Sequence, residues 1–154
     1  MMKKETCQAS MCVLFAVLVF MFLAVSAHAA ESSIVGVWSF IGDEGPDKGK
    51  ERAQMEIYEK NGIYEGKYVK LPLLAPGAIC STCTGDRKDK PLVGMVFVWG
   101  MKKTGDNEYS GGRVYETEKG KEYKCKLSLD NPDRLKLQGC IGFLCKNKYW
   151  NRIK

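Results

Sequence analysis

The chemistry open to this sequence is set mainly by its cysteines, which can form disulfides, bind metal ions or act as redox pairs. Cys7 and Cys12 lie near the amino terminus, and the remaining cysteines begin at position 80. Cys80-Ser81-Thr82-Cys83 is a Cys-x-x-Cys pair in a stretch that is rich in proline and glycine. We predict that Cys80 and Cys83 form a disulfide that staples this loop.

Two other uses of the same pair remain open. A redox-active Cys-x-x-Cys pair is activated at a helix N-terminus, but no helical pattern follows Cys83. A zinc site would combine the pair with Cys140 and Cys145, whose spacing resembles that of zinc ribbons. An oxidising compartment counts against zinc, because four thiolates would have to escape oxidation.

Cys140 and Cys145 flank Gly142-Phe143, which we predict to be a two-residue type II′ hairpin turn because glycine stands first. The two cysteines then oppose each other with Cα atoms about 4.5 Å apart, which is within disulfide range. This register also turns Lys146 and Lys148 toward the apolar side of the last strand. A bulge after Cys145 or a longer loop would be needed to bring these lysines out.

Catalytic side chains are scarce. His28 is the only histidine and belongs to the amino-terminal segment, so the rest of the chain excludes chemistry that needs imidazole. Asp43, Glu44 and Asp47 cluster in a glycine- and proline-containing loop without the apolar surroundings of a catalytic carboxylate. We therefore predict a protein that is not an enzyme and that uses neither a cofactor nor a metal ion.

Residues 1–29 have the pattern of an export signal. Two lysines precede the uninterrupted apolar run Val13–Val25, and Ala27-His28-Ala29 supplies the small residues of a cleavage site. The run is shorter than the about 20 residues that span a bilayer. We predict cleavage, a mature chain over 30–154 in the periplasm or outside the cell, and no stable membrane span after cleavage. An uncleaved anchor over 11–30 is the alternative.

The elements that position these residues are strands. No segment after residue 30 shows a helical period, whereas alternation and turn signals recur as in an all-β barrel or sandwich. We predict strands at 34–40, 53–59, 64–71, 92–101, 109–115, 121–129, 135–141 and 144–153. Gly111-Gly112 predicts a bulge or a sharp bend. Eight strands in up-and-down order predict a closed antiparallel barrel, and a sandwich is the alternative.

The predicted interior is apolar and aromatic. The strand over 92–101 has large residues at odd positions and small ones at most even positions, so its odd positions should face inward. Cys125 alternates with apolar residues and is predicted to be a buried free thiol. The predicted ligand-binding residues are the inward aromatics and methionines: Trp38, Met55, Tyr58, Tyr64, Met95, Phe97, Trp99, Tyr115 and Tyr123. The alternative is that they only fill the core. The long loop over 72–91 is the natural lid of a cavity.

Gly36-x-Trp38 in the first strand and Trp150-x-Arg152 in the last resemble the motifs of the lipocalin-like, or calycin, barrels. The resemblance implies that Trp38 closes one end of the barrel and that Arg152 packs over it, a contact worth about 0.5–2 kcal/mol. Gly36, Trp38, Trp150 and Arg152 are therefore predicted to be structural residues.

A longer pattern connects these two motifs. It includes Cys80-x-x-Cys83, Pro91-Leu92-Val93-Gly94, Gly111-Gly112-Arg113-Val114-Tyr115 and Gly139-Cys140. It is similar to a family of exported bacterial proteins of uncharacterised role, domain-of-unknown-function family number 2147. The resemblance implies a lipocalin-like barrel in the cell envelope or outside the cell, and it supplies no ligand or activity.

We predict an exported protein that binds a small hydrophobic or amphipathic molecule inside the barrel. The alternative is an envelope or secreted interaction protein with a filled barrel, which binds a protein or a glycan through its surface. The chain carries a net charge of +6, and we expect the lysine clusters over 119–126 and 146–154 to form a solvated outer face. Nucleic acid is disfavoured as a partner because no exposed aromatic stacking pattern is present. The oligomeric state is not predicted.

Overall fold

The computed structural model describes residues 33–154, so the predicted export signal over 1–29 lies outside the described residues. The described chain forms eight strands and two short 3₁₀ helices, η1 (Gly45–Asp47) and η2 (Gly85–Arg87). The strands are β1 (Gly36–Ile41), β2 (Glu51–Lys60), β3 (Ile63–Lys70), β4 (Val96–Lys103), β5 (Glu108–Glu116), β6 (Lys121–Asn131), β7 (Arg134–Ile141) and β8 (Leu144–Arg152). Within residues 33–154, no helix has the length and apolar character needed to cross a membrane.

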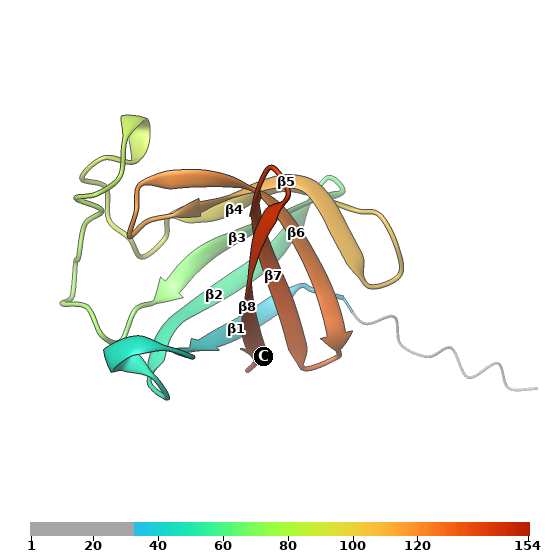
Figure 1. Ribbon diagram of the computed structural model, residues 1–154, viewed down its shortest axis with the longest axis horizontal. Coiled ribbons are helices and arrows are strands. Elements are labelled where there is room, and N and C mark those ends of the chain that lie inside the picture. The colour runs from blue at the N-terminus through green and yellow to red at the C-terminus, as the bar shows by residue number, and fades with distance from the viewer. Residues whose placement is uncertain (1–32) are drawn as a thin grey trace, which may run out of the picture. The chain divides into compact units, whose positions relative to one another are not determined.

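The strands form a closed antiparallel barrel in which each strand pairs with its neighbours in sequence (Figure 1). The barrel closes where β1 pairs with β8 and Trp38 lies opposite Arg152. The predicted fold class, an all-β eight-stranded up-and-down barrel, is confirmed. Closure leaves no unpaired strand edge on which another chain could add.

The up-and-down order gives the barrel two different ends. The β2–β3, β4–β5 and β6–β7 turns lie at one end together with Ser33 and the carboxyl terminus. The β1–β2, β5–β6 and β7–β8 turns lie at the other end with the long β3–β4 connection, residues 71–95. Figure 1 shows this connection in lime green, beside the orange turn between β5 and β6. We call the end with the carboxyl terminus the closed end, and the end with the long β3–β4 connection the open end.

The closed end is filled by side chains. Trp38 is fully buried and donates its indole N–H to the Ile34 carbonyl at 2.9 Å. The Arg152 guanidinium lies 4.2 Å from the centre of the Trp38 ring. Gly36 has no room for a Cβ atom, which would collide with the Lys154 carbonyl and the Arg152 side chain. Met55 and Met101, both fully buried, complete this part of the core.

The predicted inward face of the fourth strand needs a correction. Residues 92–95 belong to the long connection, and β4 begins only at Val96. A register shift against β3 falls between the pairs Gly66–Val98 and Lys67–Val96, and Phe97 and Val98 are both buried. After this shift the alternation is reversed, because a bulge moves the following side chains to the other face. Trp99 is therefore not an inward residue, and Val93 is 54% exposed. A second shift, between the pairs Tyr64–Met101 and Gly66–Val98, returns Met101 to the core.

Candidate ligand-binding cavity

A cavity of about 780 Å³ opens at the open end of the barrel. Its volume lies within the range of about 300–1,000 Å³ that is usual for small-molecule sites. The deepest part is lined by apolar and aromatic side chains from β1, β2, β3, β4, β7 and β8, namely Phe40, Ala53, Tyr68, Phe97, Leu137 and Trp150. The barrel is thus filled at one end and hollow at the other.

The aromatic rings of this floor contact one another. The Tyr68 and Phe97 rings are stacked, with centroids 3.8 Å apart and an interplanar angle of 5°. Trp150 lies 5.3 Å from the Phe40 ring and 6.2 Å from the Phe97 ring. Burial raises the pKa of Tyr68 to about 12, so its phenol stays neutral at physiological pH. The floor therefore offers apolar surface together with one neutral hydroxyl group.

The rim of the cavity is apolar and exposed. Leu73, Leu74 and Ile79 contribute from the long connection, and Ile141 and Leu144 contribute from the two sides of the β7–β8 turn. Ile141 is 59% exposed and Leu144 is 69% exposed. Large apolar side chains grouped at the mouth of a cavity are typical of a surface that meets a ligand or a partner.

Two lysines of β8 face the cavity. Gly139 pairs with Lys146 and Leu137 pairs with Lys148, with no bulge in the β7–β8 ladder. Both lysines line the cavity, and the Lys148 ammonium lies 5.3 Å from the centre of the Phe40 ring. The expectation that Lys146 and Lys148 belong to a solvated outer face is therefore wrong. The regular two-residue turn holds the register that points them inward.

The acidic side chains of the rim are already paired with other cations. Asp47 lies 3.5 Å from Lys50 and 3.9 Å from Arg52, and Glu118 binds Arg52. Glu116 lies 3.1 Å from Lys119. Burial of Glu116 opposes its ionisation, but hydrogen bonds from Lys119 and Tyr123 outweigh this effect and lower its pKa. Within residues 33–154, no salt bridge joins Lys146 or Lys148 to a carboxylate, although the positive charge of Lys148 also helps to lower the pKa of Glu116.

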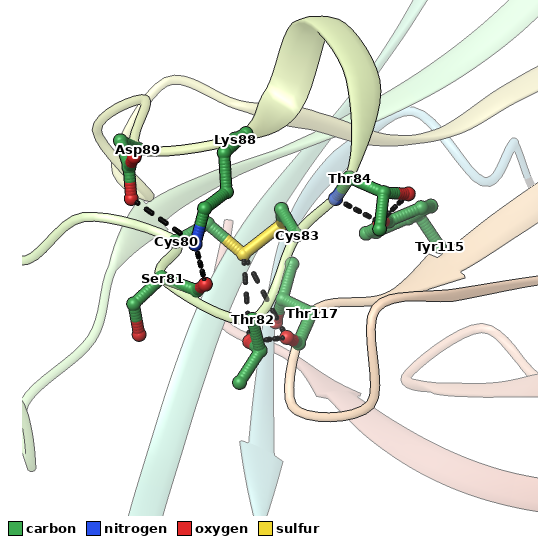
Figure 2. The surroundings of a disulfide bond; sticks show 9 residues. All are labelled: Cys80, Ser81, Thr82, Cys83, Thr84, Lys88, Asp89, Tyr115 and Thr117. Carbon is green, nitrogen blue, oxygen red and sulfur yellow. Dashed lines mark hydrogen bonds and ion pairs between the residues drawn. A yellow bond between two sulfur atoms is a disulfide. The ribbon is translucent and has the colours of Figure 1, made fainter.

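The structure contains the predicted Cys80–Cys83 disulfide, which closes a small loop within the long connection at one side of the mouth (Figure 2). Thr82 donates its hydroxyl hydrogen to the Thr117 carbonyl. The backbone N–H of Thr84 donates to the Tyr115 hydroxyl at 3.0 Å. These contacts anchor the loop against the β5–β6 turn.

Arg87 in η2 provides a second anchor for the same loop. Its guanidinium lies 4.5 Å from the centre of the Trp99 ring and 4.9 Å from that of Tyr115. Since both aromatic residues belong to the barrel wall, this contact fixes the loop to β4 and β5. The part of the loop around η2 therefore packs against the barrel wall.

The predicted Cys140–Cys145 disulfide is also present, across a directly opposed pair with Cα atoms 4.1 Å apart. Gly142 has a φ of +57°, as the predicted type II′ turn requires. Cys125 is the free cysteine of the described chain. Its thiol is buried, and burial raises its pKa to about 12. This placement agrees with the prediction that Cys125 is a buried and unreactive thiol.

The structure brings three of the predicted ligand-binding residues to the cavity wall: Phe97, Tyr115 and Tyr123. The other six do not line the cavity. Trp38 and Met55 fill the closed end, and Tyr64 packs against Tyr109 with ring centroids 4.8 Å apart. Tyr58 donates to the Glu65 carboxylate at 2.7 Å and is covered by Lys67. Trp99 is covered by Arg87, and Met95 lies in a shallow groove beside η2.

Sequence reasoning missed most of the floor and the two lysines. Phe40, Tyr68 and Leu137 stand in predicted strands, but aromatic content alone did not separate the filled end from the hollow end. For Lys146 and Lys148 the signal was present in the hairpin register, which predicted their inward direction. Trp150, which is predicted to be a structural residue, also forms part of the floor.

Comparison with known proteins supports the fold and the family. The family model described as uncharacterized protein conserved in bacteria (DUF2147) matches residues 36–152. Among solved structures, the chain is similar to protein HP1028 from the human pathogen Helicobacter pylori, described as belonging to the lipocalin family. The two are 19% identical, the match covers 79% of this chain and 84% of that chain, and the TM-score is 0.68. At this identity the likeness concerns the fold alone.

A comparison with curated proteins found no match. The family model, in contrast, extends from the first residue of β1 to the last residue of β8. The chain therefore belongs to the DUF2147 family of bacterial proteins, and its barrel is lipocalin-like.

Proposed function

We propose that this protein binds one small hydrophobic or amphipathic molecule in the cavity at the open end of the barrel. The observation that carries the proposal is the hollow open end itself, about 780 Å³ lined by Phe40, Phe97 and Trp150. Burial of apolar ligand surface against such a floor contributes about 25 cal/mol per Å². The exposed apolar rim supports the same proposal, because a ligand can exchange water for apolar contact before it reaches the floor.

We propose that the protein acts outside the cytoplasm and does so without catalysing a reaction. Two disulfides in the described chain support export, since disulfides persist in oxidising compartments. The cavity wall offers a neutral phenol and paired carboxylates, an arrangement that suits binding.

The test is a titration of delipidated protein with single-chain amphiphiles, followed by tryptophan fluorescence. Trp150 lines the cavity, so a bound chain should change its emission and the change should saturate near one molecule per protein. The same experiment with Gly139→Leu should lose about tenfold or more in affinity. Gly139 lines the cavity, and a Cβ atom at this position meets Val114 and Tyr123 only at ordinary contact distances, so the added side chain fills space that the ligand needs.

Gln138→Leu is the matched control. Gln138 lies next to Gly139 on β7 but does not line the cavity. Its side-chain amide donates a hydrogen bond of 2.9 Å to the Asn147 side chain. This variant adds a leucine at the neighbouring position and should bind as the unchanged protein does. Absence of saturable binding across neutral, anionic and cationic amphiphiles would refute the proposal and favour the surface-interaction alternative.

A further inference from the structure

We infer that the ligand of this cavity carries a single anionic head group, and that Lys146 and Lys148 hold this group above an apolar chain. The inference rests on the proposed function and deepens it by naming the ligand class, a single-chain anionic amphiphile. It follows from the alternation of side chains along β8, from the pairing of the rim charges and from the position of Lys148.

The inward residues of β8 change in character from the floor to the mouth. Trp150 is 3% exposed and forms part of the floor, Lys148 comes next on the same face, and Lys146 follows toward the turn. Inward positions on a strand are separated by about 6.6 Å, twice the rise per residue. One strand therefore presents an apolar ring and then two ammonium groups along the path of a bound chain, which is the pattern of an amphiphile inserted chain first.

Placing Lys148 on an inward face has a cost that the protein itself offsets only in part. A partly buried cation is stabilised by an acidic partner or by water. Lys148 is only partly exposed, and its ammonium lies 5.3 Å from the centre of the Phe40 ring. Its charge interacts with the Glu116 carboxylate, but the two groups form no salt bridge. Asp47, Glu116 and Glu118 line the same cavity, but each is paired with another cation. The two inward ammonium groups thus form no salt bridge with the carboxylates of residues 33–154, and an anion that comes from outside can take that place.

The outer faces of the barrel provide the contrast. Lys124 and Lys126 of β6 are exposed, and they pair across the ladder with Cys140 and Gln138 rather than with cavity residues. They carry the same charge as the inward pair but lie on the other face of the sheet. Charge alone would make the two pairs equivalent, whereas the inference assigns head-group binding to the inward pair only.

The experiment compares three probes with the same twelve-carbon chain: dodecanoate, dodecanol and dodecylamine. Binding to delipidated protein is measured by titration calorimetry at neutral pH and below the micelle concentration. We expect dodecanoate to bind about tenfold or more tightly than dodecanol, because a hydrogen bond to a charged group is stronger than one to a neutral group. Dodecylamine should bind most weakly.

The variants locate this preference. Lys146→Gln/Lys148→Gln should bind dodecanoate and dodecanol with nearly equal affinity, and the ratio of the two affinities cancels any change that the substitutions make to the cavity itself. Lys124→Gln/Lys126→Gln has the same net charge and should keep the full preference. Lys146→Arg/Lys148→Arg should restore it. Lys146→Gln alone changes an exposed residue at the mouth and tests the same point if the double variant does not fold.

The outcomes separate the two proposals. Equal affinity of the unchanged protein for dodecanoate and dodecanol would overturn the anionic head group and leave the proposed binding function standing. Equal loss of preference in the inward and outer lysine variants would also overturn it, since a long-range charge effect would then suffice. Failure of all three probes to bind would overturn the binding function and the inference together.

Discussion

Arg152 shows how far single residues could be predicted. Its contact with Trp38 followed from the motif, and the structure places the guanidinium 4.2 Å from the indole ring. The structure adds hydrogen bonds from the same side chain to the carbonyls of Ser33 at 2.6 Å, Val35 at 3.0 Å and Pro132 at 2.7 Å. These acceptors belong to segments far apart in sequence, so no local pattern could indicate them.

We predict that Arg152→Ala lowers the free energy of unfolding by about 2–4 kcal/mol. The change removes hydrogen bonds between a charged donor and three carbonyl groups, which are worth more than neutral ones, and it uncovers Trp38. Arg152→Lys should recover less than half of the loss in stability, because a single ammonium group cannot replace a planar guanidinium that donates to three separate carbonyl groups. Urea unfolding monitored by circular dichroism measures both values. A lysine variant as stable as the unchanged protein would show that charge alone matters here.

Among the elements, β4 and β5 separate what the sequence pattern predicted from what it missed. The strands themselves and the irregularity at Gly111-Gly112 were predicted, and a register shift between β5 and β6 lies between Tyr109 and Gly112. The reversal at Phe97 was missed, because nothing in an alternating apolar run marks where one extra residue is inserted. That single shift moved Trp99 out of the predicted binding set.

We predict that Gly112→Ala destabilises the barrel by more than Gly111→Ala does. A Cβ atom at Gly112 would collide with the Trp99 carbonyl and with Met101, so the backbone of β4 would have to move. Gly111 has open space around it but a φ of +86°, and an alanine there costs about 1–2 kcal/mol. Thermal unfolding of the two variants provides the comparison. If Gly111→Ala is the more damaging change, the need for glycine in this part of β5 comes from the backbone conformation and not from the close approach of β4.

For the whole molecule, the decisive feature is the difference between the two ends of the barrel. The sequence pattern predicted a closed barrel with an apolar interior but did not predict where that interior is empty. The hairpin register indicates that Lys146 and Lys148 point inward unless a bulge or a longer loop intervenes, and a filled core would not accommodate their ammonium groups. A partly open cavity removes that objection, since the lysines can reach water or a ligand at the mouth.

The same asymmetry predicts where a ligand should protect the backbone from hydrogen exchange. Backbone amides exchange when a local segment of the structure opens, and a ligand slows this exchange only in segments that it stabilises. With dodecanoate bound, we expect slower exchange in the connection over 71–95 and around the turn at 142–143, which surround the cavity. The turns at 61–62, 104–107 and 132–133 lie at the closed end and should exchange at unchanged rates. Gly139→Leu at the same probe concentration should show weaker protection at the open end and unchanged exchange at the closed end. Equal protection of both ends in the unchanged protein would place the ligand elsewhere than in the cavity at the open end.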